Sequence, residues 1–304
     1  MTENIDFLLV TEEERGERLD KVLASRFKEK YSRTYFQQLI NADLVLVNGL
    51  PAQKRIQLEA EDEIEIQFTT LPTDISLTPE PIPLSILYED SHLLVINKPA
   101  GMVVHPAPGN WNHTFVNALL HHCKTFPIEK STRPGIVHRI DKDTSGVLLA
   151  AKTLEAQYKL IDLFSRRLVE KEYLAICIGK GVDGTIDAPI GRHPIHRKQM
   201  AVVSNGKQAI THCSLIGWNG KLSLVNIKIA TGRTHQIRVH LKYKNTPVLG
   251  DPLYGNSSFN QSYSTQRQLL HARRVAIHHP ITGEFLEFFA PIPCDMQKII
   301  DTIL

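Results

Sequence analysis

The feature that most constrains the fold is a short polar segment between two apolar runs. The first run ends at Val137, five of the six residues 138–143 are titratable or charged, and residues 147–151 are apolar again. This pattern predicts a strand, a polar loop and a second strand, with acids and bases held on a rigid frame. Such a loop can hold one carboxylate beside guanidinium groups, which keep it ionised and oriented. Alternatively, Asp143 and Thr144 only cap backbone N–H groups in a tight turn.

A resemblance to a known family favours the first reading. Residues 138–146 are His-Arg-Ile-Asp-Lys-Asp-Thr-Ser-Gly. This run resembles the signature His-Arg-Leu-Asp-x-x-Thr-Ser-Gly of the RluA/RluD-type pseudouridine synthases, with Ile140 in place of the usual leucine. The resemblance implies that Asp141 is the catalytic residue. It also implies that Arg139 enters the space that a flipped base vacates.

Two further motifs of this family follow in the expected order. Residues 171–175, Lys-Glu-Tyr-Leu-Ala, resemble its Lys-x-Tyr-x-Ala motif, which implies that Tyr173 packs against the target base. Residues 231–240, Thr-Gly-Arg-Thr-His-Gln-Ile-Arg-Val-His, are similar to a third signature. That similarity implies that Arg238 is the partner of the catalytic aspartate.

The residue types alone leave alternatives open. A tyrosine in an alternating strand, such as Tyr173, is more typical of a core position. An arginine paired with an aspartate is more often a structural ion pair than a catalytic one. In a pocket, however, Arg238 would fix the direction of the carboxylate, which could then act without a metal.

The implied reaction is the isomerisation of uridine to pseudouridine. It breaks the bond between a sugar carbon and a base nitrogen, turns the uracil and rejoins it through carbon. No atom is gained or lost, so we expect no cofactor and no metal. A carboxylate must either add covalently or take a proton from the sugar, and the sequence leaves both open. A uridine in a folded stem-loop must first be flipped into the pocket.

The N-terminal part predicts a small helix–helix–hairpin unit. One apolar face is formed by Leu19, Val22, Leu23 and Phe27, Ser32 is placed to cap a second helix, and strands are expected at 44–49 and 64–68. The unit is similar to the S-four-type RNA-binding domain, through residues 18–23, 32–33 and 45–49. Residues 41–43, Asn-Ala-Asp, replace the usual glycine after the second helix.

This second resemblance implies RNA contacts outside the catalytic motifs. Arg33, Lys54 and Arg55 would meet phosphates, although a solvated basic face is the alternative for any one of them. In the third catalytic motif, Arg233 and His235 are also expected to bind RNA.

A proline-rich stretch divides the chain. Residues 69–85 contain four prolines among threonines and serines, which predicts a semi-extended linker. The predicted organisation is an RNA-binding domain over 1–70 with its core at about 16–68, a linker over 71–85 and a catalytic domain over 86–304.

In the catalytic domain, strands outnumber helices and hairpins outnumber crossovers. We therefore expect an α+β fold with a mixed, largely antiparallel sheet and flanking helices, which the resemblance identifies as the pseudouridine synthase fold. Strands are predicted at 86–90, 93–99, 101–106, 171–177, 224–229 and 285–290, helices from Thr114, at 154–167 and at 296–303, and a loop at 191–207. The helix at 154–167 would bury Leu154, Tyr158, Ile161 and Phe164 or Leu168.

Composition narrows the setting. The net charge of +3 suits a polyanionic partner without requiring one. The N-terminus is acidic, unlike a signal peptide, and apolar runs are too short to span a membrane. The four cysteines follow no metal-ligand spacing and are expected to be reduced core residues. We therefore expect a cytoplasmic protein, and nothing in the sequence demands a dimer.

Rival functions fit less well. A zinc deaminase would need a Pro-Cys-x-x-Cys motif, but Pro293-Cys294 has no second cysteine. A hydrolytic glycosidase would need two carboxylates, and only Asp141 has a recognisable setting. The resemblance implies a pseudouridine synthase acting on RNA, with large-subunit ribosomal RNA as the expected substrate. The alternatives are a synthase acting on transfer RNA and a non-catalytic RNA-binding or ribosome-assembly factor.

Overall fold

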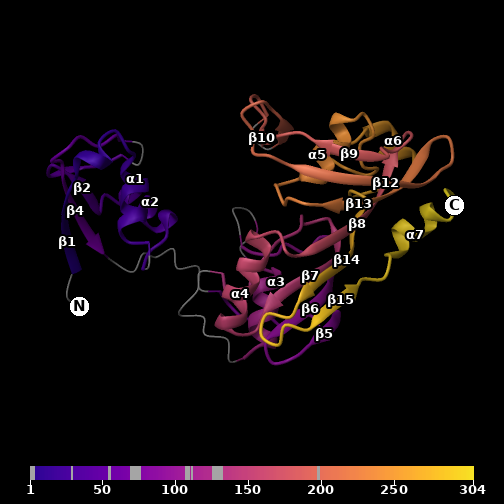
Figure 1. The fold of residues 1–304 in the computed structure, drawn as a ribbon, viewed down its shortest axis with the longest axis horizontal. Helices are drawn as coiled ribbons and strands as arrows, with labels where there is room; N and C mark the ends of the chain where they lie inside the picture. Colours follow the sequence, from indigo (N-terminus) through magenta and orange to yellow (C-terminus); the bar gives the residue numbers. More distant parts are fainter. Residues whose placement is uncertain are drawn as a thin grey trace. The chain divides into compact units, whose positions relative to one another are not determined.

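The chain divides into two compact units, Met1–Ser76 and Leu77–Leu304 (Figure 1). The computed structural model describes residues 4–28, 30–53, 56–68, 77–106, 110, 112–124, 133–196 and 199–304. Part of the expected linker at 71–85 lies outside the described residues. The described end of this segment belongs to the second unit, where the Asn117 side chain donates to the carbonyl of Thr78 and the Glu80 amide donates to the carbonyl of Asn117. The domain limits drawn from the sequence stay a prediction.

The first unit packs two helices on an antiparallel sheet with the order β1-β4-β2-β3. The Ser32 side chain accepts a hydrogen bond from the Tyr35 amide at 3.2 Å, which satisfies one free N–H at the start of α2. Asn48 and Gly49 both have positive φ, the conformation that joins two strands in a tight hairpin. The elements are β1 (Asn4–Leu9), a 3₁₀ turn (Glu12–Glu14), α1 (Leu19–Arg26), α2 (Arg33–Asn41), β2 (Val45–Val47), β3 (Leu50–Pro51) and β4 (Glu63–Phe68).

The second unit is built on one large sheet. Within the described part of the chain, nine strands run in the order β5-β6-β7-β14-β8-β13-β12-β9, with β15 also paired to β14. Among the described strands, only β7 and β14 pair in parallel, so the predicted α+β class with a mixed, largely antiparallel sheet is confirmed. The strands are β5 (Ile86–Glu89), β6 (Leu93–Lys98), β7 (Ser145–Ala151), β8 (Glu170–Ile178), β9 (Gly184–Asp187), β12 (Ile210–Trp218), β13 (Leu222–Ile229), β14 (Leu270–His278) and β15 (Phe285–Phe289).

Helices cover both faces of this sheet at β6 and β7 (Figure 1). On one face, the side chains of Leu94 and Ile96 share a core with Phe115 of α3; on the other, Leu93 shares a core with Leu160 of α4. Every residue of β7 is buried, as expected of a strand covered on both faces. The helices are α3 (Phe115–His122), α4 (Leu154–Ser165), α5 (Gln236–Tyr243), α6 (Ser257–Ser262) and α7 (Cys294–Ile300).

Several local predictions were wrong. Residues 101–106 form a turn and a single bridge, not a strand, because Gly101 takes φ +86 and the buried amine of Lys98 hydrogen-bonds two nearby carbonyl groups. The segment before the charged loop is likewise irregular, with one isolated bridge at Ile136. The stretch 191–207 is partly ordered as the hairpin of β10 (Ile190–Arg192) and β11 (Met200–Val202).

The inward face predicted for α4 was wrong at Tyr158 and Ile161, although Phe164 packs against the core as predicted. Tyr158 and Ile161 are 66% and 43% exposed, whereas Ala156 and Leu160 are fully buried. The helix carries two apolar series at the same spacing, and periodicity alone does not choose between them. Docking on β7 selects the series with the small Ala156, which lets the helix approach the sheet closely. No helix within the described ranges is long and apolar enough to cross a membrane.

Candidate active site

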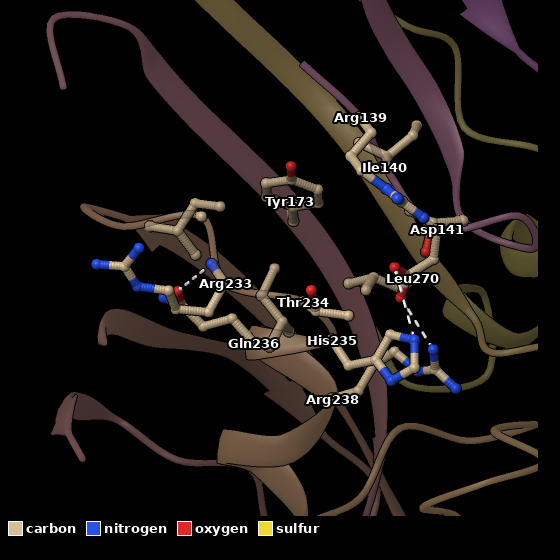
Figure 2. Close-up of a pocket in the computed structure, with 14 residues that line it drawn as sticks. Arg139, Ile140, Asp141, Tyr173, Arg233, Thr234, His235, Gln236, Arg238 and Leu270 are labelled. Atoms are coloured by element: carbon tan, nitrogen blue, oxygen red, sulfur yellow. Dashed lines mark hydrogen bonds and ion pairs between the residues drawn. The ribbon is translucent and has the colours of Figure 1, made fainter. Parts of the chain in front are cut away.

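The carboxylate of Asp141 and the guanidinium group of Arg238 form an ion pair. Arg238 Nη1 donates to Asp141 Oδ2 at 2.9 Å (Figure 2). Asp141 lies in the loop that precedes β7, and Arg238 is in the first turn of α5, a helix that the sequence did not predict. The Arg238 side chain is 4% exposed and that of Asp141 22%, so the carboxylate is the partner that reaches solvent.

The loop that carries Asp141 is fixed through its backbone. The carbonyl of Lys142 accepts hydrogen bonds from Lys98 Nζ at 2.8 Å and from the Gly101 amide at 3.0 Å, and the carbonyl of Asp143 accepts from Arg267 Nη1 at 3.1 Å. After the loop, Gly146 has φ +113, and a Cβ there would lie 2.2 Å from the carbonyl oxygen of Ala272. Only glycine therefore lets β7 approach β14 at this point.

One pocket contains six of the predicted site residues. Asp141, Tyr173 and Arg238 line it together with Arg139, Arg233 and His235, although these residues come from three separate parts of the sequence. Figure 2 shows Asp141 between Arg139 and the side chains of His235 and Arg238. The remaining lining residues are Ile140, Thr144, Ile229, Gly232, Thr234, Gln236, Ile237 and Leu270.

Tyr173 provides an aromatic wall of this pocket. It lies in β8, paired with Ile227 of β13 and Ala272 of β14, and is 8% exposed. Burial raises the pKa of its hydroxyl group, and the negative charge of Asp141 raises it further. The phenol therefore stays protonated at neutral pH. The tyrosine is a core residue and also a pocket residue, so the two sequence-based interpretations are compatible.

His235 stands beside the carboxylate in a strained backbone conformation. Its φ is +56, rare for a residue other than glycine. Its Nε2 lies 4.0 Å from Asp141 Oδ1, and its Nδ1 lies 2.9 Å from the hydroxyl oxygen of Tyr254. Burial lowers the pKa of His235, so the imidazole is neutral at pH 7.

Two residues near the ion pair were missed by the sequence analysis. Asp251 binds Arg238 through both carboxylate oxygens, at 2.6 and 2.8 Å, and is fully buried. The ring centre of Tyr254 lies 5.1 Å from the guanidinium carbon of Arg238. Both residues belong to the run 250–255, Gly-Asp-Pro-Leu-Tyr-Gly, which by local rules indicates only a turn.

Other motif residues are structural. His138 Nε2 accepts a hydrogen bond from the Leu149 amide at 2.9 Å, and the His138 ring stacks on Phe164. Burial lowers the pKa of His138 to about 3, which keeps the imidazole neutral and able to accept. The side chain of Gln236 accepts from the Arg233 amide and donates to the carbonyl of Ile210, and so fixes the loop before α5.

In the first unit, Arg33 is held by a buried carboxylate. Asp20 is fully buried and accepts hydrogen bonds from Arg33 and Arg18, each through Nε and Nη2, and from Gln37. The side chains of Arg18 and Arg33 remain 40% and 46% exposed. Lys54 and Arg55, which we also expected to contact RNA, lie outside the described residues.

Comparison with known proteins gives a consistent result. The RNA pseudouridylate synthase family matches residues 92–243, and the S4 domain matches residues 17–64. A ribosomal large subunit pseudouridine synthase D of Nitrosomonas europaea is 43% identical over 99% of this chain and 88% of its own length. The protein of the same name in Escherichia coli K12 is 40% identical over 97% of this chain and 93% of its own.

Solved structures agree with these sequence relatives. The human RNA pseudouridylate synthase domain containing 4 superposes with a TM-score of 0.57 at 26% identity, covering 72% of this chain and 92% of its own. The fold is thus that of an RNA-modifying enzyme. The chain belongs to the RNA pseudouridylate synthase family, and its reaction is the isomerisation of uridine to pseudouridine in RNA.

Proposed function

We propose that this chain converts specific uridines of large-subunit ribosomal RNA to pseudouridine, with Asp141 as the catalytic residue. The observation that carries the proposal is the Asp141–Arg238 ion pair at the wall of a pocket that Tyr173 also lines. The relatives from Nitrosomonas europaea and Escherichia coli are named for this substrate, and they match nearly the whole chain. Their bacterial origin also supports a cytoplasmic location.

The pocket suggests a division of roles. The uracil of a flipped uridine packs on the ring of Tyr173, and the exposed Arg139 enters the space that the base vacates. Arg238 occupies Asp141 Oδ2, so the second oxygen, Oδ1, faces the sugar. Through Oδ1, Asp141 either adds to the sugar carbon as the bond to nitrogen breaks, or removes a sugar proton. Arg233 and His235, at the same pocket, contact the RNA.

The first unit would hold RNA through its phosphates. Asp20 orients two arginines, Arg18 and Arg33, by their Nε and Nη2 edges. Among the described residues, nothing accepts a hydrogen bond from Nη1 of either arginine, so each Nη1 group can donate to a phosphate oxygen. Two arginines on one carboxylate leave a net positive charge, which favours phosphate binding.

Tritium release tests this function. The isomerisation frees the hydrogen at carbon 5 of uracil, so RNA labelled at that position releases tritium. Ribosomal and transfer RNA are supplied separately to the native protein and to Asp141→Asn. We expect release from ribosomal RNA by the native protein and a loss of at least about 10³-fold in the variant. Release only from transfer RNA would replace the substrate assignment, and tight binding without release from either RNA would favour an assembly factor.

A further inference from the structure

Arg238 is shared between two carboxylates that differ in their surroundings. Its Nη1 donates to Asp141, whereas Nε and Nη2 donate to Asp251 at 2.6 and 2.8 Å. The Asp251 side chain is fully buried, and that of Asp141 reaches solvent. Asp251 therefore takes the two-nitrogen edge of the guanidinium group, which is the edge that suits a carboxylate fork.

This arrangement limits Asp141 to a single contact with Arg238. An arginine that faced Asp141 alone would pair with both of its oxygens in the same fork geometry. Because Asp251 occupies Nε and Nη2, Arg238 binds only Oδ2. Within the described part of the chain, Oδ1 accepts no hydrogen bond, and His235 Nε2 lies 4.0 Å from it. The trio of two carboxylates and one guanidinium group also keeps a net negative charge.

Asp251 is itself held firmly. Its Oδ1 accepts hydrogen bonds from the amides of Leu253 and Tyr254 at 2.9 and 3.0 Å. Asn260 of α6 donates to the carbonyl of Asp251 and accepts from the amide of Gly250. Gly250 has φ +80, and a Cβ there would lie 1.9 Å from the carbonyl oxygen of Arg267. The segment is thus fixed on several sides, so the direction of the Asp251 carboxylate is determined before substrate binds.

We propose that Asp251 is a positioning residue for the reaction. It orients the guanidinium group of Arg238 so that Asp141 keeps one carboxylate oxygen free for the sugar. The inference rests on the proposed function. Both possible roles of Asp141, addition to the sugar carbon and removal of a sugar proton, use a lone pair on that free oxygen. Asp251 is not among the residues that line the pocket, and it acts through Arg238.

The test is Asp251→Asn, which keeps an oxygen for the amides of Leu253 and Tyr254 but removes the charge and one acceptor. We expect kcat for tritium release to fall by roughly 100-fold, the effect of a small misplacement of a reacting group, while KM for RNA stays within about threefold. The matched control is Glu287→Gln, because Arg274 is likewise shared by several carboxylates but lies outside the pocket. We expect native kcat in this control.

A double-variant cycle separates positioning from general stability. The side chain introduced by Arg238→Lys has no fork for Asp251 to orient, so adding Asp251→Asn should lower kcat little further. Multiplicative losses in the double variant would overturn the proposal, as would a folded Asp251→Asn with native kcat. If Asp251→Asn does not fold, Asn260→Ser loosens the same segment without removing charge, and an unchanged kcat in it would count against the proposal. Absence of tritium release by the native protein would instead refute the proposed function.

Discussion

The side-chain amine of Lys98 lies 2.8 Å from the carbonyl oxygen of Lys142, the residue that follows the proposed catalytic aspartate in the chain. The same amine donates to the carbonyls of Pro99 and Met102, at 2.6 and 3.0 Å, and the side chain is fully buried. Three acceptors match the three N–H groups of an ammonium ion, although burial lowers the pKa of Lys98 to about 7. Lys98 thus connects the end of β6 to the loop that holds Asp141.

Lys98→Met should damage both stability and activity. It leaves three carbonyl groups without this donor, and we expect the free energy of unfolding to fall by about 2–4 kcal/mol. A looser loop should lower kcat by about tenfold or more. Urea unfolding and tritium release measure the two effects. Lys159→Met, on the exposed side of α4, is the control and should change stability by less than about 0.5 kcal/mol. Native stability in Lys98→Met would contradict this account.

Two substitutions at Tyr173 distinguish a role of its aromatic ring from a role of its hydroxyl group. Tyr173→Phe keeps the ring, whereas Tyr173→Leu loses a stacking contact of about 1–3 kcal/mol per base. We therefore expect the phenylalanine variant to retain at least about tenfold more kcat/KM than the leucine variant. Steady-state tritium release measures the ratio. Equal losses in the two variants would mean that the reaction needs the hydroxyl group, which is protonated at neutral pH.

Arg33 should contribute to RNA affinity and leave the chemical step unchanged. In Arg33→Gln we expect weaker binding and a slope of log K against log salt that is less steep by about 0.9, the value for one lost phosphate contact on a duplex. Filter binding over a series of salt concentrations measures the slope, and single-turnover kinetics at saturating protein checks the chemical step. An unchanged slope would identify Arg33 as a purely structural partner of Asp20.

The lowered pKa of Asp20 predicts how the free energy of unfolding depends on pH in the acid range. Burial raises its pKa, but hydrogen bonds from Arg33, Gln37 and Arg18 outweigh burial and bring the pKa down to about 2, from 3.8. A lowered pKa means that the folded state prefers the carboxylate, so this stabilisation is full above about pH 4 and is lost as the pH falls through about 2. Asp20→Asn should therefore be less stable than the native protein at pH 5 to 7. Thermal melts should show the difference shrinking toward pH 2; a difference independent of pH would exclude this mechanism.

Features that depend on neighbouring residues could be predicted from the sequence, whereas features that depend on tertiary packing could not. The second helix could be placed from Ser32 and an apolar face, because caps and periodicity depend on neighbouring residues. The α4 face and the turn at 101–106 could not, because packing against β7 and the amine of Lys98 decides them. β14 was missed altogether, although it lies between β7 and β8 and completes the sheet beneath the pocket.

By itself, the sequence predicted the two-part character of the chain and the mixed sheet, because hydrophobic spacing and turn residues act locally. The three motifs that contain Asp141, Tyr173 and Arg238 were recognised through their resemblance to a known family. Only the tertiary structure decided which groups meet: Asp141 and Arg238 are 97 positions apart, and their contact depends on where α5 begins and which strands lie side by side. Asp251 shows the limit most clearly. Its local sequence indicates a turn, and its role arises because folding buries its carboxylate against the far edge of Arg238.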